Sequence, residues 1–191
     1  MPAKRGRPTA SDRAERRERV RAMISRILIE QGLSALTFDR VAEAARVAKR
    51  TLYDDFGDRA GMLRAAVERQ HRYLHADPPV PDDLVDAAIA LSADLLRDEA
   101  VALQRAVIAA AADHPEIAAE FYASGPRAAR RFLAARIRSG DPEGDAEALL
   151  SLLLGELHRR RMLGVSPAPD AAEITRRARR AVALAVGAAS R

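Results

Sequence analysis

Basic and hydroxyl side chains gather in a short segment near residue 50. Lys49, Arg50 and Thr51 are consecutive, and Tyr53 stands four residues after Lys49. On a helix, positions i, i+1 and i+4 lie on one side, so Lys49, Arg50 and Tyr53 would share an outward surface. Arg and Lys can donate to guanine O6 and N7 in a major groove, while Thr and Tyr can contact bases or phosphates. This segment therefore has the chemistry to bind a DNA duplex.

The same segment also has an apolar side. Leu52 and Phe56 are spaced i, i+4 and would face inward together with Val47. A helix with basic residues outside and apolar residues inside is, however, the usual pattern of a solvated surface helix. The helix pattern alone therefore leaves DNA binding and simple solvation as alternatives.

Two short helices are expected to position these side chains. Thr37 can cap a helix that contains Val41, and a break at residues 46–47 leads into a helix from about Ala48 to Asp55. Two short helices joined by so brief a turn predict a helix-turn-helix.

Longer helices are expected on either side of this pair. The first opens at Ser11 or Asp12 and ends at Gly32, a residue suited to a helix C-terminus. After the pair, Asp58 can cap a helix that connects two bodies and extends over residues 58–75.

The positive charge of the chain lies in its first third. The whole chain carries a net charge of +5; residues 1–60 hold 14 basic and 9 acidic side chains, and residues 61–191 hold 18 of each. A basic segment joined to a neutral one suggests that one end meets a polyanion and the other has a different task.

The segment from Leu36 to Leu63 resembles the TetR family of bacterial transcriptional regulators, and the resemblance is strong over about residues 12–63. It is carried by an ordered set of positions. These are Thr37, Val41, Ala42, Ala45, Val47, Thr51, Leu52, Tyr53, Phe56, Arg59 and Leu63.

The resemblance implies an all-α fold of about nine helices, with an N-terminal three-helix helix-turn-helix DNA-binding domain and a C-terminal helical ligand-binding and dimerisation domain. It implies a sequence-specific transcriptional regulator, a repressor released from a pseudo-palindromic operator by a small molecule. It also implies DNA contacts, namely phosphate contacts from Thr37, Tyr53 and Arg59 and contacts to bases or adjacent backbone from Lys49, Arg50 and Thr51.

Three features depart from the family pattern. Arg46 stands in the turn where Gly is usual, which is costly if the backbone there needs a positive φ. Ala48 stands where Ser or Thr often caps the recognition helix, at a cost of roughly 1 kcal/mol. Asp54 and Asp55 bring negative charge where His, Tyr or Asn is usual, so we expect weaker phosphate contact there.

The N-terminal residues add a second basic motif. Residues 4–8 read Lys-Arg-Gly-Arg-Pro, which is similar to an AT-hook and would place Arg5 and Arg7 in a narrow minor groove. The alternative is a disordered, solvated basic tail. We expect residues 1–10 to be a disordered arm.

The rest of the chain is expected to divide by task. The helix-turn-helix domain would occupy residues 11–57, the connecting helix residues 58–75, and the ligand-binding and dimerisation domain residues 76–191. Three prolines between His75 and Asp83 mark a linker. Further helices are expected at about residues 82–97, 99–112, 115–138 with a kink or break at Gly125 and Pro126, 145–163, and 170–188.

Two sets of residues are candidates for ligand and dimer contacts. By resemblance, the inducer pocket would use Gln70, Tyr73, Phe121, Tyr122 and His158. The alternative for each is an ordinary core or surface role. Apolar helical faces would form the homodimer interface through Leu149, Leu150, Leu153, Leu154, Leu157, Ile174, Ala178, Ala181, Val182 and Ala185. Alternatively, these faces line the core of one protomer. Two DNA-reading heads that reach successive grooves about 34 Å apart need a symmetric partner, which favours the homodimer.

Several function classes find no support in the sequence. The absence of cysteine removes thiol chemistry, and no metal-ligand cluster, phosphate loop or Gly-x-Ser-x-Gly elbow occurs, so we expect no enzyme activity and no cofactor. No apolar run is long enough to span a membrane, so we expect a cytoplasmic protein without membrane contact. A nonspecific nucleoid-type DNA-binding protein with a helical dimerisation scaffold remains the alternative function.

Overall fold

The computed structural model describes residues 10–71, 73, 76 and 79–187, and these residues form ten α-helices and one 3-10 turn. The all-α fold is thus confirmed, with one helix more than expected because Gly125 and Pro126 break the segment 115–138. The elements are α1 Ala10–Gln31, the 3-10 turn Leu33–Ala35, α2 Phe38–Ala45, α3 Lys49–Phe56, α4 Arg59–Gln70, α5 Leu84–Leu95, α6 Asp98–Ala110, α7 Pro115–Ser124, α8 Pro126–Ala134, α9 Pro142–Met162 and α10 Ala171–Gly187.

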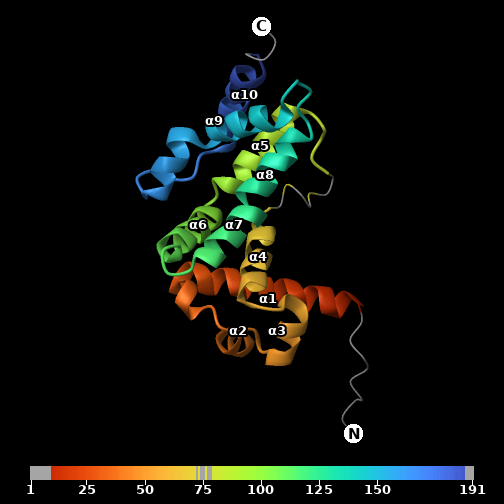
Figure 1. Cartoon of the computed structure of the whole chain (residues 1–191), viewed down its shortest axis with the longest axis vertical. Coiled ribbons are helices and arrows are strands. Elements are labelled where there is room, and N and C mark those ends of the chain that lie inside the picture. The colour runs from red at the N-terminus through yellow and green to blue at the C-terminus, as the bar shows by residue number, and fades with distance from the viewer. Residues whose placement is uncertain (1–9, 72, 74–75, 77–78, 188–191) are drawn as a thin grey trace.

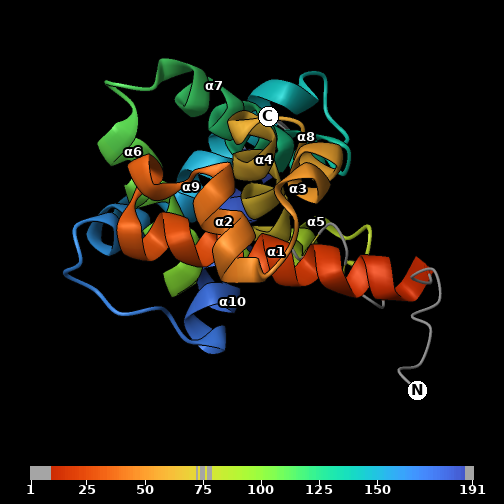
Figure 2. The same ribbon diagram turned by 90° about the horizontal axis from the view of Figure 1, so that it is seen from below.

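The molecule is elongated, with the helix-turn-helix at one end (Figure 1). Helices α2 and α3 lie below α1, and α4 rises from them towards the upper body formed by α5, α8, α9 and α10. Seen from below, α2 and α3 are presented at this end while α1 runs across the molecule (Figure 2). The basic arm with Arg5 and Arg7 lies outside the described residues.

One core, called here the head core, joins α1 to α4 with parts of α6 and α7. Apolar residues of α1 recur at helical spacing, so Val20, Ile24 and Leu28 are buried together. Burying one such side chain fully stabilises the fold by about 1.5–3 kcal/mol. The head core also takes in residues of the C-terminal half of the chain, namely Leu103, Val107 and Ile117.

A second core, called here the body core, joins α5, α8, α9 and α10. Small side chains are frequent in it, and Ala88, Ala146 and Ala178 have no exposed surface. Small residues let helix backbones approach closely, and α10 packs against both α5 and α9.

The body core contains most of the side chains expected at the dimer interface. Seven of the ten are buried within one protomer, as in the alternative that these faces line its core. They are Leu149, Leu153, Leu157, Ile174, Ala178, Ala181 and Ala185. Apolar helical spacing is the same for a protomer core and for an interface, so the sequence pattern could not separate the two.

The connecting helix is shorter than expected. Helix α4 ends at Gln70 and not near residue 75, and the backbone turns at His71, whose N–H donates to the Glu68 carbonyl at 3.0 Å. The N–H of Tyr73 then donates to the buried carboxylate of Asp94 on α5 at 2.8 Å. A contact with another helix thus holds the segment after α4 in place, and the local sequence does not predict this contact.

None of the helices in the described residues is long and apolar enough to cross a membrane.

Candidate DNA interface and ligand cavity

The turn between α2 and α3 depends on an arginine in a left-handed conformation. Arg46 has φ 54° and ψ 48°, and among the described residues it is the only one besides glycine with a positive φ. The turn is closed by the N–H of Val47, which donates to the Ala42 carbonyl at 3.0 Å. The departure at Arg46 therefore has the expected cost, about 1–2 kcal/mol for a residue with a Cβ.

The two helices of the motif begin differently. Thr37 caps α2 as predicted, since its hydroxyl accepts from the Arg40 N–H at 3.2 Å. Ala48 takes the same extended conformation before α3 but provides no side-chain cap. The first N–H groups of α3 are thus left for solvent or for an anion, the natural ligand of a helix N-terminus.

The outward side of α3 carries one unengaged cation and one engaged cation. Arg50 is exposed, and no hydrogen bond or ion pair joins its side chain to another described residue. The Lys49 ammonium lies 2.9 Å from a carboxylate oxygen of Asp39 on α2. This hydrogen bond raises the pKa of Lys49, so the residue stays charged. Thr51 lies beside them, half-buried.

Tyr53 is positioned by an aromatic contact that the sequence pattern did not reveal. Its ring stacks on that of Phe38, the first residue of α2, with centroids 4.0 Å apart and planes at 11°. Tyr53 is nevertheless 49% exposed. The stack fixes the ring between the two helices and leaves the hydroxyl end open to a partner.

One of the two aspartates that oppose phosphate contact is turned away from this surface. The Asp55 carboxylate lies 3.7 Å from the Arg16 guanidinium, and the Asp55 carbonyl accepts from Arg17 at 3.1 Å. Both arginines belong to α1, so the charge of Asp55 is balanced within the head. Asp54 remains exposed on α3.

Arg59 has an internal partner. Asp58 caps α4 as predicted by accepting from the Gly61 N–H at 2.7 Å, and Arg59 follows as the first helical residue. Its half-buried guanidinium donates to the Leu33 carbonyl in the 3-10 turn. The side chain connects α4 to the 3-10 turn that follows α1, a role that the resemblance did not suggest.

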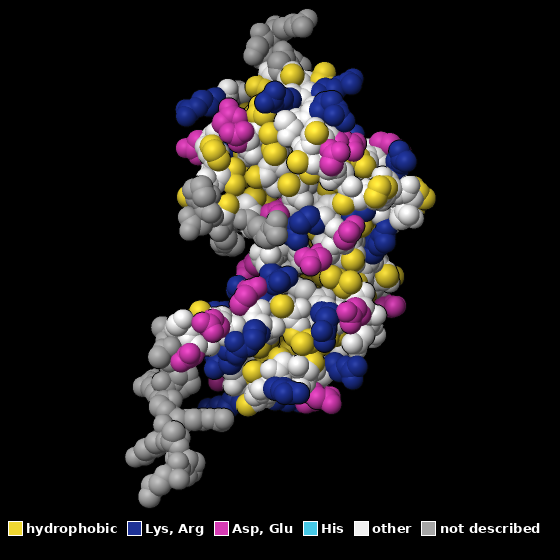
Figure 3. All heavy atoms as spheres, turned by 180° about the vertical axis from the view of Figure 1, so that it is seen from behind, with side chains coloured by type: hydrophobic (Ala, Val, Ile, Leu, Met, Phe, Trp, Pro, Cys, Tyr) yellow, Lys and Arg dark blue, Asp and Glu magenta, His cyan; other side chains and the backbone are white. Residues whose placement is uncertain are grey.

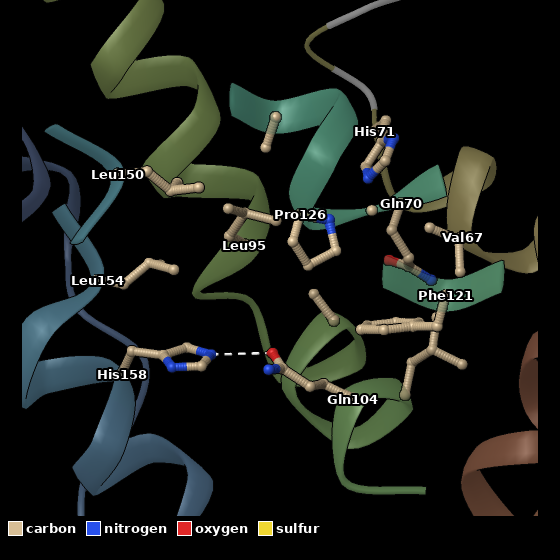
Figure 4. A pocket seen from close by; sticks show the side chains of 14 residues that line it. Val67, Gln70, His71, Leu95, Gln104, Phe121, Pro126, Leu150, Leu154 and His158 are labelled. Atoms are coloured by element: carbon tan, nitrogen blue, oxygen red, sulfur yellow. Dashed lines mark hydrogen bonds between the residues drawn. The ribbon is translucent and has the colours of Figure 1, made fainter. Parts of the chain in front are cut away.

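A cavity of about 70 Å³ lies where the head core meets the body core (Figure 4). Figure 4 shows Gln70 and Val67 on one side of it and Leu154 and His158 on the other. The described residues that line it are Val67, Gln70, His71, Leu95, Ala100, Leu103, Gln104, Phe121, Gly125, Pro126, Ala129, Leu150, Leu154 and His158.

Three of the five expected ligand residues line this cavity, namely Gln70, Phe121 and His158, and two do not. Tyr73 is buried in the body core, where its ring meets the edge of Phe132 at 4.7 Å and burial raises its pKa. Tyr122 is 50% exposed on α7. Neither tyrosine lines this cavity, because aromatic type alone does not show which side of a helix faces it.

Two cavity residues on opposite helices are paired. The His158 Nε2 and the Gln104 Oε1 are 2.9 Å apart, so His158 donates through Nε2 in the neutral ring. Burial, and then the nearby Arg161, lower the pKa of His158. Gln104 was not predicted, and a glutamine in an otherwise apolar stretch of α6 is the only sequence signal that could have indicated it.

An exposed apolar face lies on the far end of the molecule. Leu152 of α9 and Leu184 of α10 are 42% and 53% exposed and line a shared groove with Glu173, Arg176 and Arg180. The view from behind shows apolar side chains spread over the upper body with charged side chains at their margins (Figure 3). In the lower part of this view, over the head, basic and acidic side chains are interspersed.

Two family models match the chain, one over its N-terminal part and one over its C-terminal part. A family model described as AefR-like transcriptional repressor, C-terminal domain, matches residues 82–188, which is more than half of the chain. A model described as bacterial regulatory proteins, tetR family, matches residues 24–66. No curated protein sequence matches the chain.

Solved structures agree with these models. The flavonoid-responsive regulator FrrA is 29% identical, with a TM-score of 0.67 over 92% of this chain and 97% of that one. A TetR regulator from Agrobacterium tumefaciens is 30% identical, with a TM-score of 0.66 over 90% and 93%. A TetR-family regulator from Mesorhizobium loti, 21% identical with a TM-score of 0.67 over 94% and 98%, shares the fold.

The chain belongs to the TetR family of bacterial transcriptional regulators. It is a DNA-binding, ligand-responsive transcriptional repressor with a helix-turn-helix, and the nonspecific nucleoid-type alternative is not favoured. Members of this family bind DNA and small molecules, form dimers and are in general transcription factors, not enzymes.

Proposed function

We propose that two copies of the chain read a pseudo-palindromic operator, with α3 of each copy in a major groove. The observation that carries this proposal is the outward side of α3, where the Arg50 side chain is exposed without a partner among the described residues and Lys49 is charged. Thr51 and Tyr53 on the same helix, and Thr37 at the start of α2, supply hydroxyl groups. Arg50 is the residue that we assign to a base edge because no described residue of the head competes for its donors.

The other proposed DNA contacts differ in whether the side chain already has a partner within the protein. We propose that Thr37 and Tyr53 hold phosphates and that Lys49 exchanges Asp39 for a phosphate or base when DNA is bound. Arg5 and Arg7 would add minor-groove contacts. Arg59 would act on DNA only if it leaves the Leu33 carbonyl, so we assign it first to the position of α4.

The homodimer is proposed to form through the exposed face of α9 and α10. Leu152 and Leu184 supply large apolar side chains there, and Glu173 stands near Arg176 and Arg180, so a two-fold axis could pair acid with base. Such a dimer would carry its two heads on the opposite side from the interface. We retain residues 11–57, 58–75 and 76–191 as proposed units for DNA reading, connection, and sensing with dimerisation, in a cytoplasmic protein.

Release is proposed to follow ligand entry into the cavity. A cavity of about 70 Å³ is well below the 300–1,000 Å³ of typical ligand sites, so a ligand must push its walls apart. One wall is the end of α4, whose 12 residues span about 18 Å and begin just after α3. A ligand that favours the expanded state would shift the population away from the DNA-binding spacing of the heads.

The cavity favours an uncharged ligand. None of the described residues that line it is Asp, Glu, Lys or Arg, so a charged group would be buried there without a counter-charge. FrrA is named as flavonoid-responsive. We propose that the present chain likewise responds to an uncharged ligand of largely apolar surface.

The test is DNA binding by the whole protein. Fluorescence anisotropy with a duplex from the upstream region of its own gene should show salt-sensitive, sequence-selective binding. Arg50→Ala should weaken it about 10- to 100-fold, the worth of a good base contact. Arg138→Ala, at an exposed arginine outside the head, is the matched control and should leave the affinity unchanged. Equal affinities for the two variants would contradict the proposed reading surface.

A further inference from the structure

Gln70 presents an unused donor next to the cavity. The residue is 4% exposed and lines the cavity, and its side-chain Nε2 is buried without a hydrogen-bond partner. A buried donor left unpaired costs about 1–3 kcal/mol. A ligand acceptor that paired with Gln70 Nε2 would remove this cost. Figure 4 shows the Gln70 side chain extending from α4 towards the ring of Phe121.

The orientation of this amide is fixed by Arg97. The Arg97 Nη2 donates to the Gln70 Oε1 at 3.0 Å and to the Gln70 carbonyl at 3.2 Å. A guanidinium has donors only, so the amide oxygen must face Arg97 and the NH₂ group must point elsewhere. The chemistry of the neighbour thus assigns the amide, and a flipped amide would set donor against donor.

Arg97 is itself held in place. Its Nε lies 3.3 Å from the Asp94 carboxylate, and its Nη1 donates to Glu99 at 3.0 Å. Asp94 is buried and also accepts from the Tyr73 N–H. The Gln70 amide is therefore held from behind by a charge cluster, which fixes the direction of its unpaired Nε2.

One other amide of the described residues lines the cavity, that of Gln104, and its oxygen is already engaged. The Gln104 Oε1 is committed to His158 Nε2, and no carboxylate lines the cavity among the described residues. The remaining lining is chiefly apolar, with Leu95, Leu103 and Leu154 among its members.

We propose that Gln70 selects the ligand: the cavity takes an uncharged, largely apolar molecule that carries an acceptor oxygen, such as a ketone or ester carbonyl, and this oxygen accepts from Gln70 Nε2. The inference rests on the proposed function, which places the ligand in this cavity. Because Gln70 is the last residue of α4, the hydrogen bond also joins the ligand directly to the helix that leads to the DNA-reading head.

The test uses two probes of nearly equal shape, acetophenone with a carbonyl and ethylbenzene without one. Isothermal titration of the full-length protein should show acetophenone binding about tenfold more tightly, the effect of one net hydrogen bond in a buried site. Gln70→Leu should reduce this ratio to about one. Retained helical circular dichroism shows that the variant is folded.

Two further variants keep the test decisive. Gln70→Glu keeps an oxygen towards Arg97 but replaces the donor by a second acceptor, so ethylbenzene should then bind more tightly than acetophenone. Gln104→Leu removes the other amide of the cavity, and the preference for acetophenone should persist. Loss of the preference in Gln104→Leu alone would assign the donor to Gln104 and overturn the proposal.

The remaining outcomes separate this inference from the proposed function. Equal affinity of the wild-type protein for both probes would overturn the role of Gln70 while leaving ligand entry intact. Binding of neither probe would overturn both the role of Gln70 and the role of the cavity. Acetophenone that binds with the expected preference, but does not loosen the DNA complex, would support the assignment of Gln70 and contradict the proposed release mechanism.

Discussion

The head core and the body core are both helical, but they are filled by different side chains. In the head core, large residues such as Ile24, Leu28 and Leu52 have no exposed surface. In the body core, alanines such as Ala88 and Ala178 are equally inaccessible. The first core interlocks large side chains, whereas the second brings helix backbones close together. The head core should therefore lose stability when a large side chain is shortened, and the body core when a small side chain is enlarged.

The largest effect is expected in the head core. Leu28→Ala removes a buried side chain whose space α1 and its neighbours cannot fully close, so the free energy of unfolding should fall by about 2–5 kcal/mol. Urea denaturation followed by circular dichroism measures this change. Leu163→Ala, at a leucine that is 72% exposed and outside the proposed dimer interface, is the control, and a loss of similar size there would remove the distinction between core and surface.

The opposite substitution, of a small side chain by a large one, tests the body core. Ala178→Leu forces a larger side chain between α10 and its neighbours, so stability should fall by about 1–3 kcal/mol. Ala183→Leu adds the same atoms at an exposed position of α10 and should cost far less. If Ala178→Leu were as stable as the wild-type protein in the same urea titration, close backbone approach would not explain the alanines.

The sequence predicted more of the head than of the body, for a physical reason. The caps at Thr37 and Asp58 and the strained turn at Arg46 are signals carried by a few adjacent residues, and each is found where it was expected. The end of α4 is bound by Asp94, which lies on another helix, so local sequence could not place it.

The candidate sites follow the same division. The surface of α3 was assembled from neighbouring residues, but the stack of Phe38 on Tyr53 joins two helices and was missed. The cavity draws Gln104 and His158 from helices far apart in the chain, so only part of it could be anticipated. Gly155, with φ 41° and ψ −139°, breaks the geometry of α9 beside the cavity, and its type alone did not reveal that.

A smaller effect is expected from supplying the missing cap of α3 in the head. Ala48→Ser provides a hydroxyl for the first N–H groups of α3, so stability should rise by about 1 kcal/mol and Tm by about 2–4 °C. Differential scanning calorimetry measures the shift. Ala44→Ser, at an exposed position inside α2, offers no cap and should not stabilise. A lower Tm for Ala48→Ser would mean that α3 begins elsewhere.

The smallest effect concerns His158 in the body. Because its pKa is lowered in the folded state, the unfolded chain takes up a proton first as pH falls below the ordinary value of about 6.5. Stability should therefore decline from that pH down to the lowered pKa and then level off. His158→Asn should flatten this part of the stability profile, whereas His114→Asn should keep it. Identical profiles for wild type and His158→Asn would contradict burial of a neutral ring.

The central claim is that this head reads sequence. Competition for the labelled upstream duplex, between the unlabelled duplex and a scrambled one of equal length and composition, tests it most directly. A specific regulator should bind its own site at least about 1,000-fold more tightly than the scrambled duplex at physiological salt. Equal displacement by the two competitors would contradict the account and leave only nonspecific electrostatic binding.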